Sequence, residues 1–182
     1  MTQTAHAMLE AETVIKLLGV EKAINQTSHQ SDTLRSGKVS GFSSVLSRLS
    51  RRSENPHAFR LGSVNRMVRQ GLPPSAAEHI AEYYGLSYQQ VSELIGISIR
   101  TLERHRRENK PLSPVQSDRL LRYARVAART EAVFENTWAA QNWLKRANPA
   151  LGGEIPMYLL DTEMGAKQVD DVLVRIEYGV YS

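Results

Sequence analysis

The fold of this chain is decided by residues 87–107, which read SYQQVSELIGISIRTLERHRR. Ser87 and Gln90 form a capping-box pattern, in which each side chain can satisfy the backbone N–H of the other residue at a helix start. Gly96 can end that helix because glycine readily adopts a positive φ angle. Ser98 can then cap a second helix. Helix, glycine-containing turn and second helix at this spacing predict a helix-turn-helix of the kind that reads DNA.

The apolar residues of this unit stand where two packed helices need them. Four of them can hold the two helices together, namely Val91, Ile95, Ile97 and Leu102. Ser92 is small enough to allow a close approach, and His105 faces the interior, where we expect it to serve packing. The second helix therefore has one apolar side and one side free for a partner.

Three arginines share that free side. At 100° per residue Arg100, Arg104 and Arg107 fall within about 60° of arc, with Glu103 beside them. Arginine can bind the O6 and N7 atoms of guanine, and a glutamate can accept from cytosine N4. An ordinary solvated helix face is the other interpretation. The predicted DNA-binding residues are Ser87, Gln89, Gln90, Ser98, Arg100, Thr101, Glu103, Arg104 and Arg107.

The charge of the chain is unevenly distributed. Its net charge is +4 over 182 residues, but residues 56–130 carry +6, residues 1–55 carry +2 and residues 131–182 carry −4. Arginine supplies 17 of the 23 cations, and its planar fork suits phosphates. A basic middle and an acidic end suggest two different partners. On the helix after the helix-turn-helix, Arg119, Arg122, Arg125 and Arg129 form a second basic surface, which can meet phosphates or be solvated.

The rest of the chain is also predicted to be helical. Ser113 and Gln116 form another capping box with Pro114 in the first turn, which opens a longer helix. Pro73 and Pro74 fit the first turn of an earlier helix. Near the C-terminus Val169, Val172, Leu173 and Ile176 follow helical spacing, and Gly179 followed by Val180 matches a glycine C-cap. No segment shows a convincing period of two, so the fold class is all-α.

Several classes of protein are excluded or disfavoured. The chain has no cysteine, which removes disulfides and thiolate chemistry. No apolar run reaches the roughly 18 residues that a membrane span needs, and the N-terminus lacks an export signal, so we expect a cytoplasmic protein without a membrane partner. No nucleophile elbow, phosphate loop, dinucleotide glycine motif or HExxH is present. Neither the scattered histidines nor the acidic pairs at 161/163 and 170/171 indicate a metal site, a cofactor site or a catalytic residue.

Beyond these patterns, the chain resembles bacterial antitoxins of the Xre/MbcA/ParS family, which are encoded beside toxins with a RES domain. The resemblance runs from about Arg69 to Ser182. It is strongest in the segments 112–120, 124–126, 140–144, 148–153 and 159–162, at Pro156, Gly165 and Val169, and in the ending 175–182. One departure is Phe134-Glu135-Asn136, where the family leads us to expect a glycine after the phenylalanine. The first seventy residues match no pattern that we can name.

The resemblance implies two tasks. Such antitoxins bind a toxin that consumes or transfers ADP-ribose from NAD, cover its active site with their C-terminal region, and repress their own operon through the helix-turn-helix. The chain itself would then be no enzyme. A stem carrying Arg175 and a tip ending in the Ser182 carboxylate could enter a pocket built for an anionic dinucleotide. The predicted toxin-binding residues are Trp143, Leu151, Pro156, Leu160, Arg175, Tyr178, Val180, Tyr181 and Ser182.

We therefore expect three regions. Residues 1–55 form a helical N-terminal arm that can support a homodimer, residues 56–115 hold the DNA-binding domain, and residues 116–182 form the toxin-binding domain. Operator DNA and a toxin from the same operon are the expected partners, with association to the nucleoid when the operator is bound. A stand-alone helix-turn-helix regulator and a small enzyme with a non-local site stay open as alternatives.

Overall fold

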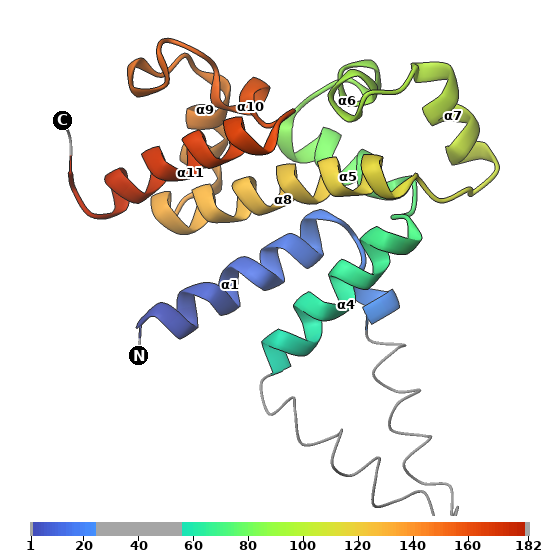
Figure 1. Cartoon of the computed structure of the whole chain (residues 1–182), viewed down its shortest axis with the longest axis horizontal. Coiled ribbons are helices and arrows are strands. Elements are labelled where there is room, and N and C mark those ends of the chain that lie inside the picture. Colours follow the sequence, from blue (N-terminus) through green and yellow to red (C-terminus); the bar gives the residue numbers. More distant parts are fainter. Residues whose placement is uncertain (1, 25–55, 181–182) are drawn as a thin grey trace, which may run out of the picture.

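The structure, a computed structural model, describes residues 2–24 and 56–180, and this part of the chain is helical without strands, as predicted. Figure 1 shows the arrangement of its elements. Their bounds are α1 Thr2–Leu17, α4 Pro56–Gln70, α5 Ser75–Tyr84, α6 Tyr88–Ile95, α7 Ile99–Arg107, α8 Pro114–Phe134, α9 Thr137–Lys145, the 3-10 helix η1 Pro149–Leu151, α10 Pro156–Leu159 and α11 Glu163–Glu177.

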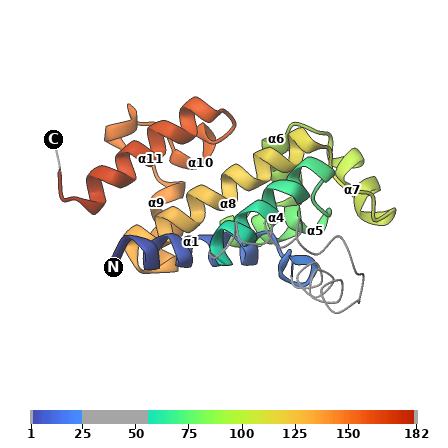
Figure 2. The same ribbon diagram turned by 60° about the horizontal axis from the view of Figure 1, so that its bottom comes forward.

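Helix α8 is the central element of the molecule. Its start carries the predicted capping box, in which Ser113 Oγ accepts from Gln116 N and the Gln116 side chain accepts from Ser113 N at 2.8 Å. It contacts α1, α4, α5, α6, α9 and α11. In Figures 1 and 2 α1 lies below it and α11 above it. A helix surrounded in this way needs apolar side chains around most of its circumference.

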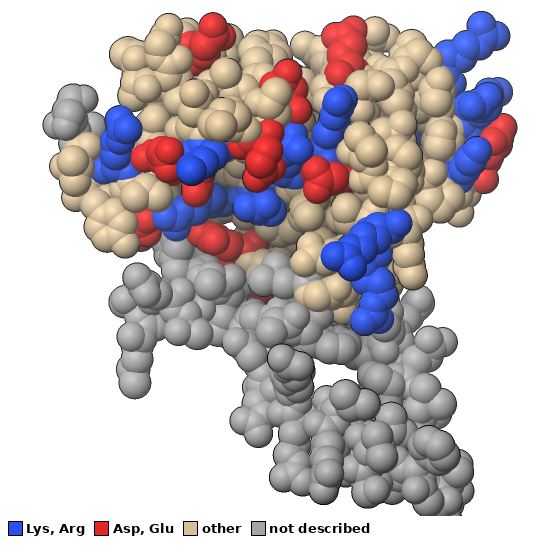
Figure 3. Space-filling model, in the orientation of Figure 1, with Lys and Arg blue, Asp and Glu red and all other residues tan. Residues whose placement is uncertain are grey.

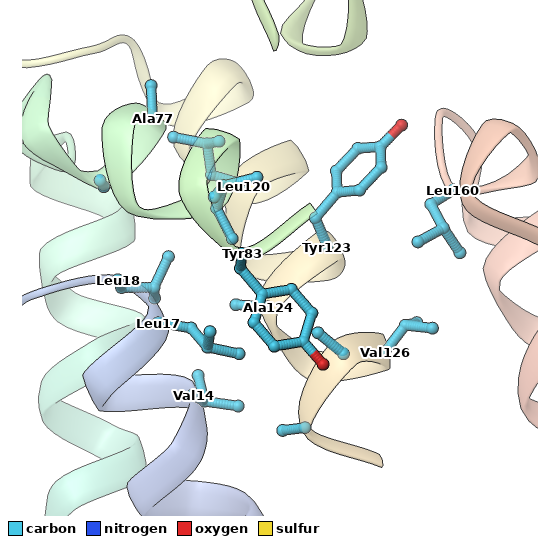
Figure 4. Packing of buried hydrophobic residues seen from close by; sticks show 14 of the residues in the cluster. Val14, Leu17, Leu18, Ala77, Tyr83, Leu120, Tyr123, Ala124, Val126 and Leu160 are labelled. Carbon is cyan, nitrogen blue, oxygen red and sulfur yellow. The ribbon is translucent and has the colours of Figure 1, made fainter. Parts of the chain in front are cut away.

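The buried residues of α8 join the whole described chain into one hydrophobic core. Leu120, Tyr123, Ala124 and Ala127 of α8 are fully buried. Figure 4 shows Leu17 of α1 and Leu18 just after it on one side of this helix and Leu160 on the other. The alanines let neighbouring helices approach closely, while Leu120 and Tyr123 fill the space that remains. The two predicted domains thus share one core.

The N-terminal helix belongs to this core. Val14, Ile15 and Leu18 are at most 4% exposed, because α1 packs against α8, α4 and α5. The predicted arm spans residues 1–55, of which residues 25–55 lie outside the described part. The apolar side of its described helix is therefore occupied within the chain itself.

Buried tyrosines close the space between α5 and α8. The Tyr84 hydroxyl donates to the Tyr123 carbonyl at 2.9 Å, and the two rings meet edge to face with centroids 5.9 Å apart. Burial raises the pKa of Tyr84 and of Tyr123, since a phenolate would lose its hydration there. Both side chains therefore act as neutral packing groups.

The start of α5 and the length of the helices can be compared with the expectations from sequence. The helix expected to begin at Pro73 and Pro74 begins at Ser75, directly after them. No helix of residues 2–24 or 56–180 is long and apolar enough to cross a bilayer.

The turn after α8 holds Glu135 at the position where the family resemblance led us to expect a glycine. Glu135 caps the helix with φ at 50°, in the left-handed region, and its N–H donates to the Glu131 carbonyl at 2.8 Å. For residues other than glycine this conformation costs free energy, because Cβ approaches the carbonyl oxygen. Asn136 then starts α9 by accepting from Ala139 N at 2.9 Å. A strained residue thus stands at the turn between α8 and α9.

We predict that Glu135→Gly raises the free energy of unfolding by about 1 kcal/mol, because glycine relieves the left-handed strain. The matched control is Glu135→Ala, which removes the carboxylate but keeps Cβ. Urea unfolding followed by circular dichroism measures both. Equal stabilisation by the two variants would show that the charge, and not the backbone, carries the effect.

Candidate functional site

Local sequence signals set the geometry of the helix-turn-helix. Ser87 Oγ accepts from Gln90 N at 3.2 Å, and Gln90 Oε1 accepts from Ser87 N at 2.9 Å. Gly96 ends α6 with φ at 76°. Ser98 Oγ accepts from Thr101 N at 3.1 Å and caps α7. These three features confirm the predicted caps and turn.

The interior of the unit also follows the prediction. Val91, Leu102 and Ser92 are fully buried, and Ser92 Oγ donates to the Gln89 carbonyl at 2.7 Å. His105 is 8% exposed, and its Nδ1 lies 3.0 Å from the carbonyl oxygens of Lys110 and Pro111. His105 therefore connects α7 to the loop that leads into α8.

The predicted DNA-binding side chains lie on the surface. Thr101 is half-buried, and the other eight are exposed: Ser87, Gln89, Gln90, Ser98, Arg100, Glu103, Arg104 and Arg107. Figure 3 shows cations gathered at the edge formed by α7. Arg100, Arg104 and Arg107 take part in none of the ion pairs found in the described part of the chain. Three cations without local neutralisation form a surface suited to a polyanion.

Arg106 has a different role from these three. Its Nε lies 2.7 Å from Glu78 Oε1 on α5, and its guanidinium stands 5.8 Å from the centroid of the Tyr88 ring. It therefore holds α7 against the two preceding helices. Sequence spacing could place Arg106 off the ridge, but it could not name Glu78 as its partner.

The second basic surface expected on α8 is corrected by the structure at Arg122. Its Nε donates to Glu163 at 3.1 Å and its Nη2 to Asp118 at 3.1 Å. Its Nη1 donates to the carbonyls of Leu160 and Asp161 at 3.2 and 2.9 Å. Arg122 is therefore occupied in holding α8 to the start of α11, with four of its five N–H donors used within the chain.

Arg129 is occupied in the same way, by Glu10, Asp170 and Glu177. Burial alone lowers the pKa of Arg129, but hydrogen bonds and charges from Glu10 and Glu177 outweigh it, so the pKa is raised. Arg119 instead lies beside the helix-turn-helix, since a Cβ on Gly96 would collide with its guanidinium group. Arg122 and Arg129 thus serve the inside of the molecule, whereas Arg125 is exposed and can still meet a phosphate or be solvated.

The C-terminal part presents a different surface. Among the described residues, seven large apolar side chains are exposed, and six of them follow α8: Trp138, Tyr158, Met164, Val174, Tyr178 and Val180. The seventh is Val115. Aromatic residues and methionine are enriched where proteins meet. This end of the molecule therefore has the composition of a protein-binding surface.

The predicted toxin-binding residues differ in their exposure. Arg175, Tyr178 and Val180 are exposed. Trp143 and Leu151 are half-buried, and the Trp143 ring stands 5.9 Å from the ring of Phe134. Tyr181 and Ser182 lie outside the described residues.

Two of the predicted toxin-binding residues are not exposed in the free chain. Pro156 and Leu160 are buried, because the short α10 turns its apolar side into the core. Trp138, which is 72% exposed, was missed. Trp138 and Trp143 are five residues apart, so they point about 140° away from each other on a helix and only one can face the core. The spacing could have shown that one tryptophan is exposed, but not which one.

Two families of known proteins match consecutive parts of this chain. Residues 63–125 match the "Antitoxin Xre-like helix-turn-helix domain" family, and residues 129–179 match the "Antitoxin Xre/MbcA/ParS C-terminal toxin-binding domain" family. The two matches meet inside α8. Within the described part of the chain, no group of three or more His, Asp or Glu residues could hold a metal ion.

Three relatives illustrate the similarity. "Antitoxin Xre" of Pseudomonas putida is 37% identical over 83 residues, which cover 46% of this chain and about half, 52%, of the relative. "Antitoxin Xre" of Photorhabdus laumondii is 30% identical over 132 residues, 71% of this chain and 84% of the relative. The "Prs ADP-ribosylating antitoxin" of a Sphingobium species is 25% identical over 136 residues, 68% of this chain and 85% of the relative.

We predict that Arg100→Ala and Arg104→Ala each weaken binding to duplex DNA from upstream of the gene by about 1 to 3 kcal/mol per lost base contact. Lys167→Ala, which removes an exposed cation from α11, is the matched control. Fluorescence anisotropy at fixed salt measures all three affinities. Wild-type affinity in both arginine variants would contradict a reading role for α7.

Proposed function

We propose a specific action for this chain, which belongs to the Xre antitoxin family and joins a helix-turn-helix domain to a toxin-binding domain. It binds a toxin with a RES domain, encoded in the same operon, that consumes or transfers ADP-ribose from NAD. It covers the active site of that toxin with its C-terminal region. The complex represses its own operon through the helix-turn-helix.

The uneven distribution of exposed apolar side chains carries this proposal. They gather after α8, in the part that the toxin-binding family matches, whereas Arg100, Arg104 and Arg107 form a cluster of exposed cations on α7. A partner protein can bury tyrosine, tryptophan and methionine at one end while DNA occupies the other. A stand-alone regulator would have no use for the apolar end. The Sphingobium relative is called a "Prs ADP-ribosylating antitoxin", and this name supports ADP-ribosyl chemistry in the proposed toxin.

The C-terminal end is the segment that would reach the toxin active site. The last helix, α11, ends at Glu177. Beyond it, Gly179 N donates to the Ile176 carbonyl at 3.2 Å and Val180 N donates to the Arg175 carbonyl at 2.9 Å. This closure agrees with the expected glycine C-cap. It leaves the Tyr178 and Val180 side chains 67% and 56% exposed. The stem thus ends in an apolar tip, and Tyr181 and Ser182 follow it in the sequence.

Repression requires that two half-sites be read together. A palindromic operator fits a twofold assembly, and the second copy of α7 can come from a homodimer of this chain or from a dimeric toxin. The apolar residues of α1 are buried in their own chain. A dimer contact through the predicted N-terminal arm would therefore have to use its other surfaces or residues 25–55.

The first test of this proposal is the deletion of residues Val180–Ser182. The deletion removes no residue of the described core, so we expect wild-type DNA affinity for the free antitoxin. We expect loss of protection in cells that express the toxin, because the tip no longer fills the active site. Val115→Ala, which truncates an exposed valine outside the toxin-binding domain, should protect fully. A shortened chain that still protects cells would contradict the proposal that the tip fills the toxin active site.

A further inference from the structure

Arg129 joins the first and last helices of the molecule. It belongs to α8, and α8 runs between α1 and α11 (Figure 1). Its Nη1 donates to Glu10 Oε1 on α1 at 3.0 Å. Its Nη2 donates to Glu177 at the end of α11, and its Nε lies 3.9 Å from Asp170. One guanidinium group thus meets carboxylates from helices that are far apart in the sequence.

The α1 side of this cluster is held firmly by packing. Glu10 precedes Ala11, and Ala11, Val14 and Leu18 are between 0% and 4% exposed. Glu10 therefore projects from a helix that cannot shift without opening the core. Its carboxylate is a fixed point to which Arg129 binds.

The α11 side has much less packing to hold it. Val172 and Leu173 are its last buried residues, Ile176 is half-buried, and Arg175, Glu177 and Tyr178 are exposed. The final turn therefore depends on its contact with Arg129 more than on apolar burial. This turn leads directly into the exposed tip.

The space between α1 and α11 is hollow beside this cluster. A groove of about 690 Å³ lies among α1, α8 and α11, with Ala11, Val126 and Ala166 in its lining. In Figure 3 charged side chains of both signs line the middle of this face. Because side chains do not fill the groove, packing alone does not set the separation of the two helices. Arg129, with a side chain only 21% exposed, spans that separation where water screens its ion pairs less than at an open surface.

We propose that Arg129 is a positioning residue for toxin binding, and that α1 takes part in toxin binding through Glu10. The proposal rests on the proposed function, because it concerns the direction in which the C-terminal stem leaves the domain. Glu177 directly precedes Tyr178 and Val180 lies two residues further, so the contact that orients Glu177 also orients the tip. Helix α1, which lies outside both matched family regions, thereby gains a role.

The test measures affinity for the purified RES-domain protein encoded beside this chain. We expect Glu10→Ala to weaken this affinity on the order of fivefold, although Glu10 is far from residues 129–179 in the sequence. Glu21→Ala, a matched change of an exposed glutamate in the same N-terminal segment, should leave it unchanged. Both variants should keep wild-type affinity for DNA, because α7 is not altered.

A double-mutant cycle separates positioning from general stability. Arg129→Gln should weaken toxin affinity at least as much as Glu10→Ala, and adding Glu10→Ala to Arg129→Gln should cause no further loss. Arg129→Lys should recover part of the affinity, because an ammonium group still attracts the carboxylates. A role in stability alone would lower the thermal unfolding midpoint and leave affinity unchanged well below that temperature.

The outcomes distinguish this inference from the proposed function. Wild-type toxin affinity in Glu10→Ala and Arg129→Gln, together with weakened binding after deletion of residues 180–182, would overturn the positioning role and leave the function standing. Undiminished binding after that deletion would overturn the proposed function itself. Equal losses in Glu10→Ala and Glu21→Ala would attribute the effect to general charge and also overturn the positioning role.

Discussion

The burial of α8 on several sides at once is the constraint on which the rest of the structure depends. Leu120, Tyr123, Ala124 and Ala127 are fully buried along it, so the helix cannot rotate or bend without disturbing neighbours on every side. The same helix ends the helix-turn-helix region and begins the toxin-binding region. The DNA-facing and protein-facing parts are consequently attached to one rigid element instead of a linker.

This arrangement explains why similar arginines have different roles. Arg104 on α7 projects from an outer helix and takes part in none of the ion pairs found among the described residues. Arg122 and Arg129 on α8 lie under other helices, and each is surrounded by carboxylates that remove the cost of burying its charge. Figure 3 reflects the result, with cations gathered at the edge formed by α7 and charges of both signs mixed across the middle of the face. The net charge of a segment therefore overstates its capacity for nucleic acid wherever helices pack against each other.

A shared core also gives the two activities a physical connection. Helix α6 of the helix-turn-helix and the C-terminal helix α11 both contact α8, and α1 braces α8 from the side opposite α11. A change of helix position at one end is resisted by packing that continues to the other. In such a protein the N-terminal segment contributes to function through the core that it completes, even where its sequence carries no motif.

The sequence by itself determined the helices, their caps and the exposed ridge of α7, because these features depend on residues three or four positions apart. Ser87, Gly96, Ser98 and Ser113 act as their local patterns indicate. Only the tertiary structure decided that Leu160 is buried, that Trp138 is exposed and that Arg122 and Arg129 are neutralised. These outcomes depend on partners roughly 40 to 120 positions away, as in the contact of Arg129 with Glu10. A helical period shows which side chains share a face, but the identity of whatever covers that face is a property of the folded chain.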